Sequence, residues 1–193
     1  QTAGAEIAGW MIEAGMQVRI DAVGNVIGRY ASGRADAPVL MTGSHFDTVR
    51  DGGRYDGRLG ILAPIVAVTH LHARGERLPF HLDVVAFAEE ESLLFHTSFL
   101  ASTALAGEFD SARLGARDAG GVTLREAMGA AGLPATEEAI AGCAVDPARL
   151  LGFIEVHIEQ GPVLLERGLP LGIVTSIAGS VRRRVAVTGT ASH

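Results

Sequence analysis

Short apolar runs alternate with helix-like stretches along most of the chain. Ile7, Met11 and Ile12 recur at helical spacing within residues 3–14, and Gly15 follows as a stop signal. Further stretches that predict helices are 59–73, 97–106, 122–131 and 161–167. The apolar or alternating runs that predict strands are 17–21, 24–30, 38–43, 79–88, 151–158, 171–177 and 181–187.

Prolines and glycines limit the regular structure that we predict in two regions, the helix 59–73 and the segment 107–150. Pro64 is tolerable in the helix 59–73 only within its first turn, because proline lacks the backbone N–H that later turns need. Residues 107–150 are interrupted by a glycine pair and by prolines. We therefore expect a surface excursion there, carrying only the short helix 122–131.

The alternation of apolar strands with helices predicts an α/β fold, with a largely parallel sheet covered by helices on both faces. In such sheets, ligands collect at the carboxyl ends of the strands. Three of the predicted strands end in residues that are able to bind a metal ion. These residues are His45 after 38–43, the glutamates 89–91 after 79–88, and His157 at the end of 151–158.

Composition narrows the class of protein. Of the 193 residues, 48% are hydrophobic and 20% are charged, which fits a globular chain with one domain, or one domain and the start of another. The net charge of −6 argues against a nucleic-acid partner, and the basic run 182–184 fits a solvated strand edge. No apolar run reaches the roughly 18 residues that a membrane span needs.

Cys143 is the only cysteine in the chain, which excludes a disulfide framework and predicts a reducing, cytoplasmic compartment. It lies in a segment rich in alanine and glycine with no adjacent histidine, so a structural thiol is favoured over a nucleophile. The chain opens at Gln1 without an initiator methionine or a signal peptide, and we expect that the native N-terminus is absent.

The segment GSHFDTVRDGGRYDG, residues 43–57, carries the strongest chemical signal. His45 supplies a neutral nitrogen ligand, and Asp47 can accept its other N–H and fix the tautomer. Asp56 has two carboxylate oxygens and can bridge two cations. Because these residues share a glycine-rich loop after an apolar strand, they predict a metal centre that activates water.

Two later segments fit the same centre. The glutamates 89–91 end an apolar strand, where cations would explain three adjacent acids; a solvated charge run is the alternative. Neighbouring side chains on a turn point to different sides, so one glutamate can bind metal while the next acts as a base. His157 stands between Glu155 and Glu159, and this pattern leaves open a metal ligand or a solvent-facing strand residue.

The motifs that carry a family resemblance are GSHFDTV-x5-YDG, AEEE, FLAS-x3-AG, GFIEVHIEQGP and the final GTASH. Together they resemble the amidase branch of the dinuclear-zinc aminoacylase/carboxypeptidase-like hydrolases. That branch includes N-carbamoyl-L-amino-acid hydrolases, allantoate amidohydrolases and β-ureidopropionases. HIEQGP is the motif that most separates the amidases from the peptidases on the same fold.

The resemblance implies a zinc-exopeptidase-like catalytic domain over residues 1–178. Residues 179–193 would be the first strand of an α+β lid domain, through which the protein would form a homodimer. Two divalent metal ions are implied as cofactors: zinc, or manganese, cobalt or nickel, since nitrogen and oxygen ligands accommodate all four. The partner in the site would be a small carbamoyl or ureido compound, with no nucleic acid and no membrane involved.

The resemblance also implies a role for each motif residue. His45, Asp56 and His157 would hold one ion. Asp56 would bridge to a second ion held by Glu91, and Glu90 would be the general base.

Two further roles follow from the same resemblance. Gln160 would lie near the substrate. His193 would reach into the site of the neighbouring subunit, where it would stabilise the developing oxyanion.

The chain departs from the family pattern at two points. After the glutamates the family commonly has glycine, a small residue, arginine and phenylalanine, whereas this chain has the segment 92–95, SLLF, so that Leu94 replaces the arginine. The late histidine that completes the family's metal ligands has no counterpart before the chain stops. We interpret the chain as an N-terminal fragment of a longer protein.

The function predicted for the intact protein is metal-dependent hydrolysis of a linear amide. The substrate would be an N-carbamoyl-L-amino acid or an allantoate-like compound, from which the carbamoyl or ureido group is cleaved. Two alternatives stay open: an aminoacylase or dipeptidase on the same fold, and a truncated metal-binding fragment without activity.

Overall fold

A computed structural model describes residues 2–91, 93–179, 181, 183 and 185–190. The chain divides into two compact units, one up to Ile158 and the other from Glu159 onward. The first unit holds the sheet and the candidate site. The predicted boundary between a catalytic domain ending at 178 and a lid strand stays a prediction.

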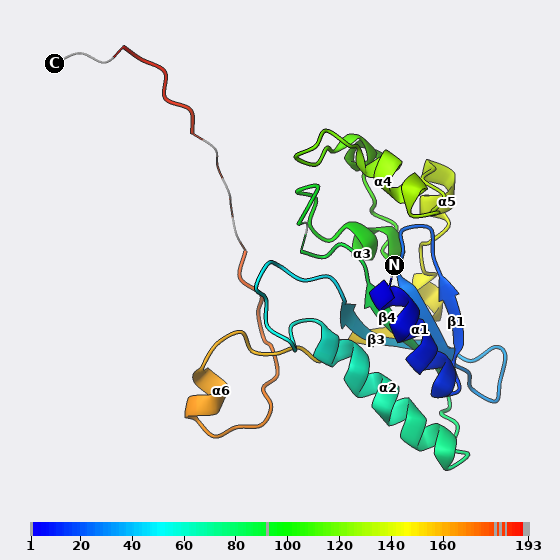
Figure 1. Cartoon of the computed structure of the whole chain (residues 1–193). Helices are drawn as coiled ribbons and strands as arrows, with labels where there is room; N and C mark the ends of the chain where they lie inside the picture. The colour runs from blue at the N-terminus through cyan, green and yellow to red at the C-terminus, as the bar shows by residue number, and fades with distance from the viewer. Residues whose placement is uncertain (1, 92, 180, 182, 184, 191–193) are drawn as a thin grey trace. The chain divides into compact units, whose positions relative to one another are not determined.

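The first unit is built on a five-stranded sheet in the order β1-β2-β4-β3-β5 (Figure 1). The strands are β1 (Gln17–Ile20), β2 (Val26–Tyr30), β3 (Val39–His45), β4 (His81–Phe87) and β5 (Leu150–Ile154). The helices are α1 (Thr2–Glu13), α2 (Arg58–Ala73), α3 (Leu100–Leu105), α4 (Leu124–Ala130) and α5 (Glu137–Ala141), with α6 (Val163–Glu166) in the second unit. Short 3-10 helices cover Ser111–Gly115 and Pro147–Arg149.

The α/β class predicted from the sequence is confirmed, but the sheet is mixed. β3 pairs in parallel with both β4 and β5, whereas β2 is antiparallel to β1 and to β4. β1 and β2 are joined by a short turn, which gives an antiparallel pair, whereas the parallel crossover from β3 to β4 runs through α2. The three parallel strands still end at one edge, as the pattern predicted.

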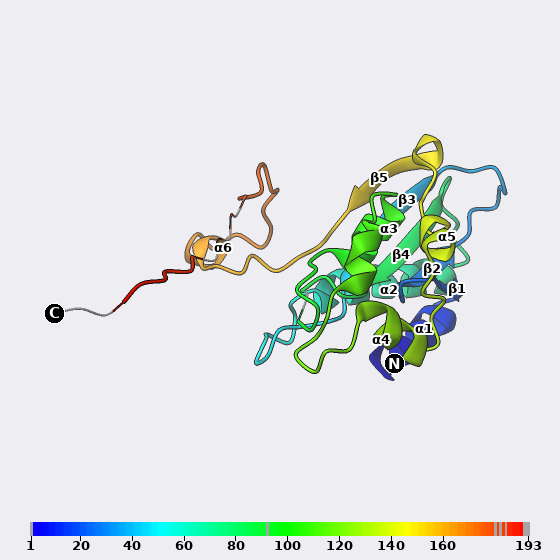
Figure 2. The same cartoon turned by 90° about the horizontal axis from the view of Figure 1, so that it is seen from above.

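The two faces of the sheet carry different layers, which can be followed in Figure 2. Helices α1 and α2 pack on one face, where Met11 and Val68 are fully buried against Val84 of β4. The opposite face packs against Leu105 of α3, which contacts a cluster containing Val85. Burial on both faces explains why β4 is an almost continuous apolar run.

Gly43 allows β3 and β4 to lie side by side near the carboxyl ends of the strands. Its φ is 153°, and a Cβ atom built there would lie 1.9 Å from the carbonyl oxygen of Val85. Any side chain would therefore force the two strands apart two residues before His45.

The segment 107–150 is more ordered than we predicted. It contains α4, α5 and both 3-10 helices, and its apolar side chains share a buried cluster with Val23 and with Leu100 and Ala104 of α3. This cluster includes Leu114, Leu124, Met128, Ile140 and Cys143. Side-chain caps begin these short helices, among them a capping box between Thr123 and Glu126 and a cap at Thr136. Such elements are too short for a periodic apolar pattern to reveal them.

Pro64 corrects a second expectation. It lies in the interior of α2, not in the first turn, because the helix begins at Arg58. The missing N–H costs a helical hydrogen bond. Burial of Pro64 between Ile61 and Ile65 provides packing that local propensity does not include.

The predicted strands after residue 150 differ most from the structure. β5 ends at Ile154, so His157 lies in the segment beyond the strand. Among the described residues of 171–190, none is in a helix or a strand. An apolar alternating run becomes a strand only when a neighbouring strand pairs with its backbone. Within the described residues, no helix combines the length and the apolar character needed to cross a bilayer.

Candidate metal centre

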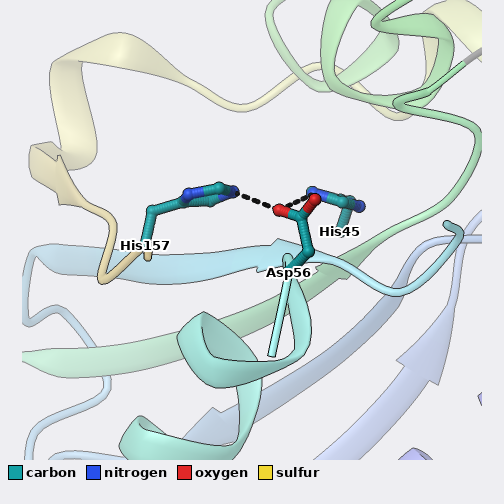
Figure 3. A group of neighbouring side chains, drawn as sticks. All are labelled: His45, Asp56 and His157. Atoms are coloured by element: carbon teal, nitrogen blue, oxygen red, sulfur yellow. Dashed lines mark ion pairs between the residues drawn. The ribbon is translucent and has the colours of Figure 1, made fainter. Parts of the chain in front are cut away.

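Three segments that are distant in the sequence meet at the carboxyl edge of the parallel strands. His45 is the last residue of β3, Asp56 lies two residues before the start of α2, and His157 follows β5. Figure 3 shows the two imidazoles on either side of the Asp56 carboxylate. His45 and Asp56 are buried, at 5% and 8% exposure.

The ligand atoms of these three side chains lie close together. His157 Nε2 is 3.2 Å from Asp56 Oδ1, and His45 Nε2 is 3.9 Å from the same oxygen. The two imidazole rings stack with centroids 5.9 Å apart and an angle of 30° between their planes. Two ligands that share a zinc-like ion at 2.0–2.2 Å can be at most about 4.4 Å apart. Both distances are therefore short enough for a shared ion.

Main-chain carbonyl groups fix the orientation of both imidazoles. His45 Nδ1 is 2.9 Å from the carbonyl oxygen of Asp47, and His157 Nδ1 is 2.8 Å from that of Ile158. A carbonyl only accepts, so each Nδ1 carries the proton and donates it. Each Nε2 is then the nitrogen that faces Asp56, the position from which an imidazole binds a metal ion.

Asp47 differs in detail from the prediction. Its main-chain carbonyl accepts the His45 N–H, whereas its carboxylate Oδ1 is 3.7 Å from Nδ1. The carboxylate instead accepts the backbone N–H groups of Glu90 and Glu91, at 3.1 and 2.9 Å. Asp47 thereby connects the loop after β3 with the turn after β4.

The glutamate turn forms a second group around His45. One ligand atom each from His45, Glu90 and Glu91 lie within 4.8 Å of one another. Glu89 starts the turn with a φ of 52°, and the carbonyl oxygen of Glu90 accepts the N–H of Phe99 at 3.1 Å. His45 is therefore common to both groups of candidate ligands.

Negative charge accumulates at this edge. Partial burial raises the pKa of Glu90, with smaller increases from the neighbouring carboxylates Glu91, Asp47 and Glu155, while His45 opposes the shift. Burial and the charge of Asp47 likewise raise the pKa of Glu89. In the described part of the chain, no arginine pairs with the glutamates of this turn. Imidazole nitrogens and carboxylate oxygens in an acidic pocket suit divalent ions such as zinc or manganese.

Two predicted residues cannot be placed at the centre. Gln160 belongs to the second unit, so its place near a substrate stays a prediction. His193 lies outside the described residues, and its proposed reach into a neighbouring subunit stays a prediction as well.

The structure adds a hydrogen bond that no sequence pattern indicated. The Ser44 hydroxyl donates to Glu155 Oε1 at 2.5 Å, which joins the end of β3 to the segment that carries His157. The only local signal was that both residues lie one or two positions before a candidate ligand histidine.

Two glycines also bring the ligand segments together. A Cβ atom at Gly57, whose φ is 72°, would lie 2.3 Å from the carbonyl oxygen of His45. A Cβ atom at Gly60 would lie 2.4 Å from that of Val156. The start of α2 can therefore approach both histidine segments only because these residues have no side chain.

Comparison with known proteins agrees with this geometry. The sequence profile of Peptidase family M28 matches residues 25–121, half of the chain. Allantoate deiminase from Arabidopsis thaliana is 42% identical over 189 residues, which are 97% of this chain and 36% of that protein. An N-carbamoyl-L-amino acid amidohydrolase from Geobacillus stearothermophilus is 42% identical over 187 residues, covering 97% of this chain and 45% of that protein.

Solved structures give the same relationship. A hydantoinase/carbamoylase family amidase from Burkholderia ambifaria has a TM-score of 0.71 and 35% identity, covering 86% of this chain and 39% of that one. AtUAH, solved in complex with (S)-hydroxyglycine, has a TM-score of 0.78 and 31% identity, covering 86% and 40%. The chain thus spans less than half the length of these relatives, and the resemblance to the amidase branch is confirmed. The chain belongs to Peptidase family M28.

Proposed function

We propose that the protein hydrolyses a linear amide, cleaving the carbamoyl or ureido group of an N-carbamoyl-L-amino acid or an allantoate-like substrate. The observation that carries the proposal is the convergence of His45, Asp56 and His157, whose ligand atoms lie within 4.8 Å of one another. Similarity to relatives named allantoate deiminase and N-carbamoyl-L-amino acid amidohydrolase supports the substrate class.

His45, Asp56 and His157 would hold one divalent ion, and Asp56 would bridge to a second held by Glu91. The support is the donor set and the two Nε2 atoms that face Asp56. When bound, such ions polarise a carbonyl group and lower the pKa of a water molecule toward about 7. Zinc is our first choice, with manganese, cobalt and nickel compatible with the same donors.

Glu90 would act as the general base. The main chain of Glu90 is fixed by Asp47 and Phe99, so its carboxylate is held at the edge of the ligand cluster. The raised pKa of Glu90 moves it toward the range in which one group accepts and returns a proton near neutral pH. Glu90 takes the proton of the attacking water and passes it to the leaving nitrogen. Collapse of the tetrahedral carbon then releases the amine and a carbamate.

The remaining parts of the proposal concern the whole protein. Residues 1–178 would form the catalytic domain, and the lid that begins at 179 would form the dimer. Gln160 would contact the substrate, and His193 would stabilise the oxyanion in the partner site. The free thiol of Cys143 is compatible with a cytoplasmic location.

The other reaction classes differ in the bond that is cleaved. An aminoacylase or dipeptidase is the second candidate, because the family profile is named for peptidases. We would assay the full-length protein with N-carbamoyl-L-amino acids, allantoate, N-acetyl-amino acids and dipeptides. Release of ammonia from the first two substrates alone is the expected result, and turnover of only the acyl or peptide substrates would overturn the proposal.

Metal content tests the centre separately from the substrate. Elemental analysis of the full-length protein is expected to find two ions per chain, and Asp56→Ala is expected to lose both because it removes the bridge. Asp51→Ala, in the same loop but exposed, is the matched control and is expected to keep both ions. Two ions retained in Asp56→Ala would exclude a bridging role.

A further inference from the structure

A polar cavity lies on the sheet face that is covered by α3 and the 107–150 segment. Its volume is about 260 Å³, and it is bordered by strands β1 to β4 and by the segment that joins α5 to β5. The charged residues that line it are Arg19, Arg29, Asp83, Asp146 and Arg149. We call this cavity the arginine pocket.

Strand register brings two of the arginines together. Arg19 on β1 and Arg29 on β2 are diagonal neighbours on one face, a relationship that places Cα atoms roughly 7–8 Å apart. Arg149 precedes β5 and donates to the carbonyl oxygen of Ala37 at 3.3 Å. The pocket is open to solvent, since the Arg29 side chain is 38% exposed.

The two carboxylates of the pocket already have partners. Arg29 donates through Nε and Nη2 to the two oxygens of Asp83, both at 2.7 Å, and this hydrogen bond raises the pKa of Arg29. Asp146 accepts the backbone N–H of Ala148 at 3.0 Å, as the cap of a 3-10 helix. Asp83 therefore neutralises Arg29 but leaves Nη1 of that guanidinium available.

Arg19 and Arg149 are not neutralised in the same way. Neither forms an ion pair with a carboxylate of the described residues. Asp36, whose pKa is lowered mainly by its hydrogen bond to Arg34 and also by the charge of Arg149, is fully exposed and already paired with Arg34. Two guanidinium groups thus line one cavity of a chain whose net charge is −6.

We propose that the arginine pocket binds a small oxyanion, a phosphate or a carboxylate group, between Arg19 and Arg149. A planar guanidinium offers paired N–H donors that match the oxygens of both anions. The apolar side chains of Val39, Met41 and Leu150 also line the pocket. They can contact the nonpolar part of a small ligand that carries the anionic group. The volume lies just below the roughly 300–1,000 Å³ of sites for drug-sized ligands, which limits the ligand to a small metabolite.

The pocket is separated from the metal centre along the strands. Met41 precedes His45 by four residues on β3, and Asp83 precedes Phe87 by four on β4, which corresponds to about 13 Å. The arginine pocket is therefore a site distinct from the proposed hydrolytic centre.

Calorimetric titration of the full-length, metal-loaded protein tests the proposal, with inorganic phosphate and succinate as the two probes. We expect one of them to bind, and we expect Arg19→Gln and Arg149→Gln each to weaken binding by about tenfold or more, the loss typical of a charged hydrogen bond. Arg149→Lys keeps the positive charge but lacks the paired N–H donors of a guanidinium. This variant is expected to bind the probe with intermediate affinity. Which probe binds identifies the phosphate or carboxylate source.

Arg125→Gln is the matched control, because Arg125 also donates to a main-chain carbonyl, that of Ala135, but lies outside the pocket. It should bind the probe as the unaltered protein does. Failure of both probes to bind would overturn the proposal, as would unchanged affinity in Arg19→Gln. Binding that survives Arg19→Gln and disappears with a metal chelator would place the anion at the metal centre, which also overturns it.

Discussion

The hydroxyl of Ser44 donates a hydrogen bond of 2.5 Å to the carboxylate of Glu155, a residue 111 positions further along the chain. Ser44 is 1% exposed and directly precedes His45, whereas Glu155 lies two residues before His157. The bond therefore sets the distance between the two segments that supply the imidazoles. Hydrogen bonds to carboxylate acceptors are stronger than those between neutral groups.

Ser44→Ala should loosen the segment that carries His157. We expect a loss of about 1 kcal/mol in the free energy of unfolding and of about tenfold in metal affinity, because an outer hydrogen bond orients the ligand. Urea unfolding and metal titration measure the two effects. Ser102→Ala, which removes an exposed hydroxyl bonded to Phe99, is the control; an equal loss of metal affinity there would contradict the assignment.

Asp47→Asn should disturb the glutamate turn more than the histidine. An amide keeps one acceptor oxygen where the carboxylate accepts two N–H groups, from Glu90 and Glu91. His45 keeps its bond, since that goes to the main-chain carbonyl of residue 47. We expect kcat to fall by about 10- to 100-fold with KM nearly unchanged. A loss confined to KM would argue against a role in positioning the base.

Glu90→Gln should retain the metal ions and lose turnover by about 10²-fold or more, because an amide cannot accept the proton of the attacking water. Elemental analysis and steady-state kinetics on the full-length protein measure the two properties. Glu108→Gln, at an exposed glutamate outside both candidate ligand groups, is expected to leave both unchanged. Activity near that of the unaltered protein in Glu90→Gln would refute the assignment of the base.

Gly57→Ala should destabilise the metal centre through backbone strain and a steric clash. Residue 57 has a φ of 72°, and the added methyl would meet the carbonyl oxygen of His45 at 2.3 Å. We expect a cost of roughly 1–3 kcal/mol in unfolding free energy, measured by urea titration. Gly53→Ala in the same loop is the control, since nothing lies within 4 Å of its Cβ position. Equal stability of the two variants would contradict this account.

Cys143 offers a probe of the buried cluster that the 107–150 segment shares with α3. Burial raises the pKa of this thiol, with a further increase from Asp21. Since the raised pKa favours the neutral thiol, we expect alkylation at pH 8 to be slow in the folded protein and fast in urea. The same shift makes folding less favourable as pH rises above the ordinary thiol pKa, because the unfolded chain ionises first. Equal alkylation rates with and without urea would show that the cluster is open.

The order of apolar and polar residues along the chain determined most secondary-structure elements of the sheet unit. It also determined the edge of the sheet at which the candidate metal centre lies. Apolar periodicity identified α1, α2 and strands β2 to β4, because each buries a continuous face or stripe whose spacing is visible in one segment. The strand β1 was also predicted, although it is largely exposed. The ends of three parallel strands, together with the motif around His45, indicated one edge of the sheet. Local signals of this kind depend only on neighbouring residues, so the sequence alone contains them.

Tertiary structure decided what depends on contacts between distant segments. The bond from Ser44 to Glu155 and the acceptance of two glutamate N–H groups by Asp47 join residues that no periodic pattern connects. Pro64 inside α2 and the buried cluster of 107–150 also contradict local rules, because packing adds free energy that propensity does not count. The arginine pocket arises from strand register, which is fixed only when β1, β2 and β4 pair.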